Sequence, residues 1–123
     1  MKQVLLVFLG GGIGSALRYA IGKFFNMSST GFPWGTFSVN IIGSLLIGVF
    51  MGVALKNNSF SENQTLLLVT GLCGGFTTFS AFAYENQQFL KVGDFTAFAI
   101  YTLCSLSLGI LAVFLGLFIS KSI

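Results

Sequence analysis

The residues best suited to hold or pass an ion lie in one short stretch, GLCGGFTTFSAF, at positions 71–82. The adjacent glycines Gly74 and Gly75 weaken a helix, because glycine loses more backbone freedom on ordering than other residues. If residues 74–77 unwind, one half-helix ends in unpaired carbonyls and the next begins with unpaired N–H groups. The first end favours a small cation and the second an anion, so the stretch predicts an ion site. A simple kink in an intact helix is the alternative interpretation.

Three further side chains have the chemistry to contact an anion. Asn40 carries an amide with two N–H donors, and an amide at hydrocarbon depth needs partners. Phe79 and Phe82 follow the glycines at i, i+3 spacing, and the edges of their rings are partially positive. Each has an ordinary alternative: an interhelical hydrogen bond for Asn40, and packing for two of the 15 phenylalanines. Function is favoured because these residues occur together with the hydroxyls of Ser80 and Ser105.

The elements that must position these residues are membrane-spanning helices. The chain has 123 residues, 54% of them hydrophobic and 7% charged, with a mean hydropathy of +0.91. A soluble domain needs a more charged surface, and a spanning helix needs about 20 mostly apolar residues. Four such stretches are present, at about 3–24, 34–55, 64–90 and 95–120. They predict an all-α integral membrane protein with a single four-helix transmembrane domain over residues 1–123, with the third helix broken.

The remaining features exclude several classes of site. The first segment is interpreted as a retained helix and not a signal peptide, because no cleavage pattern precedes Arg18. Cys73 and Cys104 fall inside predicted spans and are interpreted as small apolar fillers. The absence of histidine argues against a zinc site or a histidine proton relay. The net charge of +3 comes from scattered residues, so nucleic-acid binding has no support. No nucleotide site is visible, and we predict no enzyme activity.

The basic residues divide almost equally between the two sides of the predicted bundle. The side of the termini holds Lys2, Lys56 and Lys121, and the other side holds Lys23, Lys91 and, if it reaches the interface, Arg18. A clear excess of Lys and Arg on one side normally fixes the orientation in the membrane. Two interpretations are therefore open with about equal weight: a weak but unique orientation, or insertion both ways with antiparallel pairing.

Small and polar residues mark the helix faces expected to pack. Gly10 and Gly14 have the G-x-x-x-G spacing that lets helix backbones approach closely. One face of the second predicted helix carries a stripe at i+4 spacing: Thr36, Asn40, Ser44, Gly48 and Gly52. On the fourth, Tyr101, Ser105 and Gly109 recur in the same way. No acidic residue is expected deep in any span, and Glu85 lies toward the end of the third.

Three motifs together resemble the Fluc/CrcB family of bacterial fluoride channels. They are G-x-C-G-G-F-T-T-F-S-x-F at 71–82, G-G-G-I-G-S-x-x-R-Y at 10–19 and G-T-F-x-x-N at 35–40. The resemblance covers essentially the whole chain. It implies an antiparallel, dual-topology homodimer with two narrow fluoride pores, whose third helices are broken at the midplane. It also implies a central structural sodium ion, held by the main-chain carbonyls of Gly74 and Thr77 from each subunit.

The resemblance also assigns roles to individual side chains. It implies that Phe79 and Phe82 line the pore, with Asn40 and Ser80 nearby and a polar track over Tyr101 and Ser105. Gly109 and Ala81 stand where relatives often have hydroxyls. Arg18 is expected to draw anions toward a vestibule.

The function that follows is passive export of fluoride across the cytoplasmic membrane, which lowers fluoride toxicity. A potential of 100 mV, negative inside, favours outward movement of an anion by about 2.3 kcal/mol per charge. The rival function is a small dual-topology, proton-coupled exporter of toxic organic cations, against which the lack of a buried carboxylate counts. A non-transporting membrane assembly partner is a third possibility, favoured if the third helix is only kinked.

Overall fold

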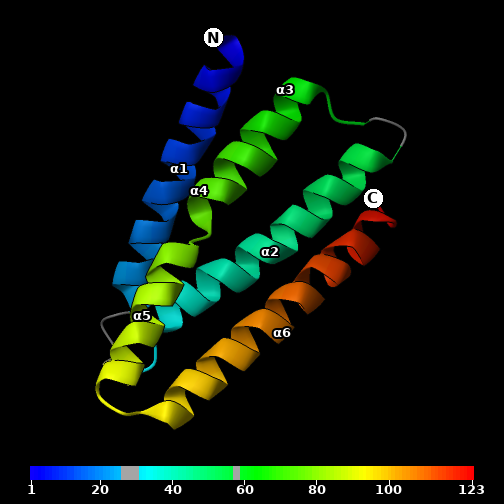
Figure 1. The fold of residues 1–123 in the computed structure, drawn as a ribbon. Coiled ribbons are helices and arrows are strands. Elements are labelled where there is room, and N and C mark those ends of the chain that lie inside the picture. The colour runs from blue at the N-terminus through cyan, green and yellow to red at the C-terminus, as the bar shows by residue number, and fades with distance from the viewer. Residues whose placement is uncertain (26–30, 57–58) are drawn as a thin grey trace.

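The structure, a computed structural model, describes residues 1–25, 31–56 and 59–123. All secondary-structure elements in this part of the chain are helical (Figure 1). In chain order they are α1 (Lys2–Phe25), α2 (Trp34–Leu55), α3 (Glu62–Thr65), the π-helix η1 (Leu66–Cys73), α4 (Gly74–Phe76), α5 (Phe79–Lys91) and α6 (Phe95–Ser120). The predicted all-helical class is therefore confirmed.

In the described part of the chain, four helical stretches are long and apolar enough to cross a membrane. They are Lys2–Phe25, Trp34–Leu55, Glu62–Lys91 and Phe95–Ser120, close to the four ranges expected from the sequence. Large apolar side chains on the outer face of α6 are exposed, Phe114 by 65% and Phe118 by 66%, as suits contact with lipid. Both termini lie at the same end of the bundle, as an even number of spans requires (Figure 1).

The helices pack through glycines that bring their backbones together. A Cβ on Gly10 would meet Leu67 O of η1, and one on Gly14 would lie 2.8 Å from Phe76 N of α4. Close packing at glycines also joins α2 to α6, where a Cβ on Gly48 would lie 3.0 Å from Gly116 Cα. Gly10, Gly14, Gly48 and Gly116 are all buried. The G-x-x-x-G face predicted on the first helix is thus a close-packing surface.

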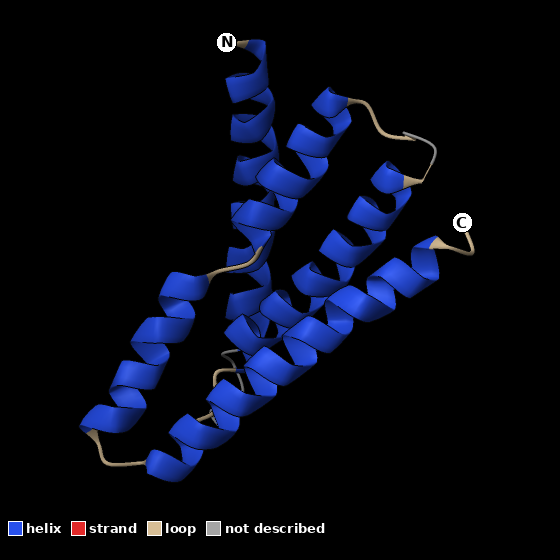
Figure 2. Ribbon diagram, turned by 45° about the vertical axis from the view of Figure 1, so that its right-hand side comes forward, coloured by secondary structure: helices blue, strands red, loops and turns tan. Residues whose placement is uncertain are grey.

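Between α4 and α5 the backbone of Thr77 and Thr78 is extended, with φ/ψ of −85°/158° and −150°/118° (Figure 2). We placed the possible break at residues 74–77, but Gly74–Phe76 are helical and the extended backbone begins at Thr77. Gly75 serves a different purpose, because a Cβ there would collide with Gly11 O and lie 2.9 Å from Gly11 Cα. Its lack of a side chain permits contact with α1, and the extended residues come immediately after it.

Candidate functional site

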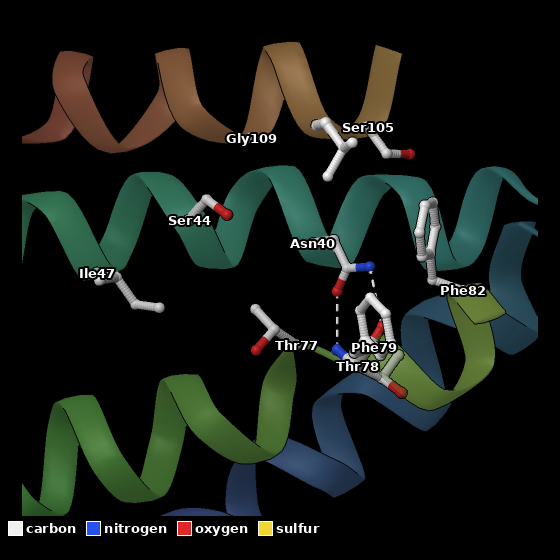
Figure 3. Close-up of a pocket in the computed structure, with 10 residues that line it drawn as sticks. Asn40, Ser44, Ile47, Thr77, Thr78, Phe79, Phe82, Ser105 and Gly109 are labelled. Carbon is white, nitrogen blue, oxygen red and sulfur yellow. Dashed lines mark hydrogen bonds between the residues drawn. The ribbon is translucent and has the colours of Figure 1, made fainter. Parts of the chain in front are cut away.

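A pocket of about 230 Å³ lies beside the extended residues (Figure 3). Its walls come from α2, the Thr77–Thr78 segment, α5 and α6, and consist of Asn40, Ser44, Ile47, Thr77, Thr78, Phe79, Phe82, Ser105, Leu106 and Gly109. Five of the residues singled out from the sequence line it: Asn40, Thr77, Phe79, Phe82 and Ser105. Residues far apart in the chain therefore meet at one place, where amide, hydroxyl and aromatic groups converge.

Asn40 of α2 holds the extended segment by two hydrogen bonds. Its Nδ2 donates to Thr78 O at 3.0 Å, and its Oδ1 accepts from Thr78 N at 2.7 Å. This pairing satisfies both polar backbone groups of Thr78, which the end of α4 leaves without helical partners. The interhelical hydrogen bond considered for Asn40 is therefore present. Since Nδ2 carries two hydrogens, the second N–H remains available to a ligand in the pocket.

Hydroxyl groups complete the ends of the two half-helices. Thr78 is the N-cap of α5, and its Oγ1 accepts from Ala81 N at 3.2 Å. Ser80 Oγ lies 3.1 Å from Thr78 Oγ1, although Ser80 itself is exposed and outside the pocket lining. Thr77 Oγ1 donates to Cys73 O at 2.9 Å at the other side of the extended segment. The interruption is thus stabilised locally on both sides.

Phe79 and Phe82 form one wall of the pocket. Their ring centroids are 5.7 Å apart and the rings are tilted by 48°. Phe82 is only 8% exposed, whereas Phe79 is 76% exposed within the single chain. Phe82 also packs on the buried Tyr101, with ring centroids 5.0 Å apart. The orientation of Phe82 therefore depends on Tyr101.

Tyr101 of α6 is tied to a carboxylate that the sequence argument left without a role. Its hydroxyl donates to Glu85 Oε1 at 2.7 Å, and Thr36 Oγ1 donates to Glu85 Oε2 at 2.6 Å. Glu85 thereby joins α2, α5 and α6, and it is partly buried. Because a phenol has one hydrogen, the Tyr101 hydroxyl would have to leave Glu85 before it could donate to another anion.

Two serine hydroxyls enter the pocket from facing helices. Ser105 Oγ of α6 is buried and has no hydrogen-bond partner among the described residues. Ser44 of α2, one turn beyond Asn40, also lines the pocket. A buried hydroxyl without a partner costs about 1–3 kcal/mol, so Ser105 is suited to donate to a ligand.

Arg18 lies behind the interruption, at a second cavity of about 410 Å³. Its Nε donates to Gly75 O at 3.0 Å, near the C-terminal end of α4. Lys23, Tyr19 and Thr36 line the same cavity. The sequence left open whether Arg18 reaches the membrane interface. In the structure its side chain contacts the third predicted span, where it offsets the partial negative charge of helix carbonyls.

The carbonyl groups of Gly74 and Thr77 fit a hard cation better than a soft one. In a continuing helix Thr78 N would donate to Gly74 O, but here Thr78 N donates to Asn40. Thr77 is extended, so its carbonyl stands outside the helical hydrogen-bond pattern. Carbonyl oxygens are the ligands that hard cations prefer. Within the described residues no group of three or more His, Cys, Asp or Glu side chains could hold a metal ion.

Sequence comparisons relate nearly the entire chain to one family. Residues 5–117 match the family described as CrcB-like protein, Camphor Resistance (CrcB). A protein of Phocaeicola vulgatus named fluoride-specific ion channel FluC is 48% identical over 98% of this chain and 100% of its own length. Proteins with the same name from Gloeothece citriformis and Flavobacterium psychrophilum are 46% and 44% identical, over 98% and 100% of this chain. They are matched over 98% and 100% of their own lengths.

Sequence reasoning missed three residues that the site uses. Thr78 had no assigned role beyond its place in the motif at 71–82, yet its backbone is the partner of Asn40. Glu85 was placed near a helix end, yet it links three helices. Ser44 was assigned to a packing stripe, yet it lines the pocket. Its i+4 spacing from Asn40 was the one signal in the sequence that could have found it.

Proposed function

The chain belongs to the CrcB-like family, and from this membership we propose that it is a fluoride-selective ion channel for passive export of fluoride. It is a multi-pass membrane protein with four helices able to span a bilayer. Curated relatives that match it end to end carry the name of a fluoride-specific channel. Conduction of an ion needs no catalytic group, and we assign none.

The observation that carries the proposal is the pocket beside Thr77 and Thr78. Fluoride binds water tightly, so a pore must replace that water with donors. Asn40 Nδ2 keeps one N–H free of Thr78, and Ser105 Oγ has no partner in the described chain. The ring edges of Phe79 and Phe82 add partial positive charge. We assign the pore to these four residues, with Ser80 beside it and with Tyr101 supporting Phe82.

The proposed assembly is an antiparallel homodimer with two pores and a central structural sodium ion. Gly74 and Thr77 of each subunit would contribute carbonyl oxygens, which suit a small hard cation. The exposed Gly74 and the nearly balanced basic residues support pairing of two oppositely inserted copies. The cation would offset the partial negative charge of helix ends that meet at the midplane of the membrane. Arg18, at the cavity that it shares with Lys23, would attract anions toward a vestibule.

The experiment that tests the proposal is efflux from liposomes containing the purified protein. Vesicles are loaded with potassium fluoride, diluted into fluoride-free medium and opened with a potassium ionophore, while an electrode records fluoride. Vesicles loaded with potassium chloride are the control, because a narrow pore excludes the larger ion. We expect rapid release of fluoride and no release of chloride. Absence of fluoride release from folded protein would contradict the proposal.

The rival function, proton-coupled export of organic cations, gains one observation from the structure. Glu85 is partly buried and accepts two hydrogen bonds, whereas the sequence argument expected no well-placed carboxylate. Both partners of Glu85 are hydroxyl groups of the protein, which leaves less of the carboxylate to a substrate cation. A pH gradient that drives uptake of a lipophilic cation into the same liposomes would favour this rival.

A further inference from the structure

We propose that Ser44 of α2 is a fluoride-binding residue of the pore and supplies, from across the helix pair, the hydroxyl that α6 lacks at Gly109. The proposal rests on the proposed function and extends it to one further residue that lines the pocket. It assigns a donor role to a side chain that helix packing alone would explain as a small residue in a stripe.

The position of Ser44 places its hydroxyl in the pocket with Asn40. The two residues are one helical turn apart on the same face of α2 (Figure 3). A rise of 1.5 Å per residue puts them about 6 Å apart along the helix axis. Ser44 has no hydrogen-bond partner in residues 1–25, 31–56 and 59–123. Its O–H is therefore available to a ligand, as the second N–H of Asn40 is.

On α6, Gly109 lies beside Ser44 and has no side-chain donor. Ser105 and Gly109 are also one turn apart and line the same pocket. Gly109 has no side chain, and a Cβ built there would lie 3.8 Å from Ser44 Oγ, the one contact within 4 Å that it would make with a described residue outside its own helix. The Ser44 hydroxyl therefore lies beside the space that a side chain at position 109 would enter. Asn40 and Ser105, each one turn before Ser44 and Gly109 on its helix, line the same pocket.

The pocket then offers a hydrogen-bond donor at each of two successive turns of α2 and α6. The first of these turns has the Asn40 amide and the Ser105 hydroxyl. One turn further along α2 and α6 the pocket is lined by Ser44 and Gly109, and Thr77 nearby has already committed its hydroxyl to Cys73 O, so the hydroxyl of Ser44 is the donor still available there. An anion that has lost water must meet a donor at each step, because an unsolvated charge in an apolar passage is very costly. Ser44 provides that step.

The test moves the hydroxyl from one helix to the other. Fluoride efflux from liposomes is compared for wild type, Ser44→Ala, Gly109→Ser and the double variant Ser44→Ala/Gly109→Ser. Serine at position 109 fits because its Cβ meets only an ordinary van der Waals contact. Ser107→Ala is the matched control for loss of a serine hydroxyl. Ser107 lies on α6, the helix of Gly109, but it is exposed and does not line the pocket.

We expect Ser44→Ala to slow fluoride efflux roughly tenfold, as the loss of a hydrogen bond to an anion predicts. The double variant should recover to within about threefold of wild type, and Ser107→Ala should be unchanged. Melting temperatures of all variants establish that each is folded. A structural role for Ser44 would not produce recovery by a hydroxyl on another helix.

Two results would overturn the assignment: wild-type efflux by Ser44→Ala, or a slowed efflux that Gly109→Ser does not restore. Absence of fluoride efflux from the wild-type protein would instead refute the proposed function, and this role with it.

Discussion

At the scale of single residues, Asn40 shows how one side chain can serve structure and ligand binding together. Its amide pairs with both polar backbone groups of Thr78, at 2.7 and 3.0 Å, and so fixes the extended segment. One N–H of the same amide is left over for the pocket. The structural and functional interpretations of Asn40, which are alternatives in the sequence, are therefore compatible in the structure.

Replacement of Asn40 by aspartate separates these two tasks. The carboxylate of Asn40→Asp can still accept from Thr78 N, but it has no N–H to donate and adds negative charge to the pocket. We expect fluoride efflux to fall more than about tenfold because an anion is repelled where it was bound. The measurement is liposome efflux, with Asn63→Asp in α3, outside the pocket, as the charge-matched control. Full activity of Asn40→Asp would remove Asn40 from the pore.

At the scale of helices, the interruption depends on the glycine contacts that precede it. Gly10 and Gly14 bring α1 against η1 and α4, and Gly75 fits against Gly11. These contacts hold the first half of the third span by its backbone, so its glycines remain helical. The chain becomes extended only at Thr77 and Thr78, where Asn40 replaces the helical partner of Thr78 N.

Two glycines of the same helix test this packing. A Cβ on Gly14 would collide with Leu72 O, whereas one on Gly12 would meet nothing within 4 Å. We expect Gly14→Ala to destabilise the protein by about 1–3 kcal/mol, because backbone cannot move aside for the methyl group. Gly12→Ala should be neutral or slightly stabilising. The measurement is heat-induced loss of helical circular dichroism in detergent micelles. Equal stability of the two variants would contradict backbone contact at Gly14.

At the scale of the whole molecule, polar residues lie between the helices and large apolar residues lie on the outer surface, as expected for a protein surrounded by lipid. Asn40, Ser44 and Ser105 face a pocket between helices, while the outer faces of α1 and α6 expose large apolar residues. A chain in lipid gains little from burying its apolar residues, so small residues and hydrogen bonds decide which faces pack. The exposed Gly74 and Phe79 belong to the surface on which we propose that a second copy lies.

The proposed assembly predicts a fixed stoichiometry of sodium binding. If Gly74 and Thr77 of two chains share one cation, equilibrium dialysis with radioactive sodium should find one ion for every two chains. Potassium should compete weakly because it is larger than a site suited to sodium. This readout does not depend on fluoride transport. Binding of one ion per chain, or no saturable binding, would contradict a shared central site.

Composition and local pattern were sufficient to predict the helices of this protein. Long apolar runs determine membrane spans because the bilayer requires about 20 such residues and internal hydrogen bonding, whatever the neighbouring helices are. The bounds expected for the second and fourth spans, 34–55 and 95–120, agree with α2 and α6. Asn40, Phe79, Phe82 and Ser105, to which the sequence assigned a role in a pore, line one pocket beside the motif at 71–82, and that role stays a prediction.

The tertiary structure alone decided which polar groups are already paired and which remain free. Hydrogen bonds across 38 residues between Asn40 and Thr78, and across 49 between Thr36 and Glu85, depend on how the helices dock. No local pattern encodes that docking, because it is set by backbone contacts at a few glycines. It moved the extended segment from the glycines to Thr77 and Thr78, committed the Tyr101 hydroxyl to Glu85, and placed Ser44 opposite Gly109. The spans follow from the chain and its solvent, whereas the donors available to an ion follow from the packing.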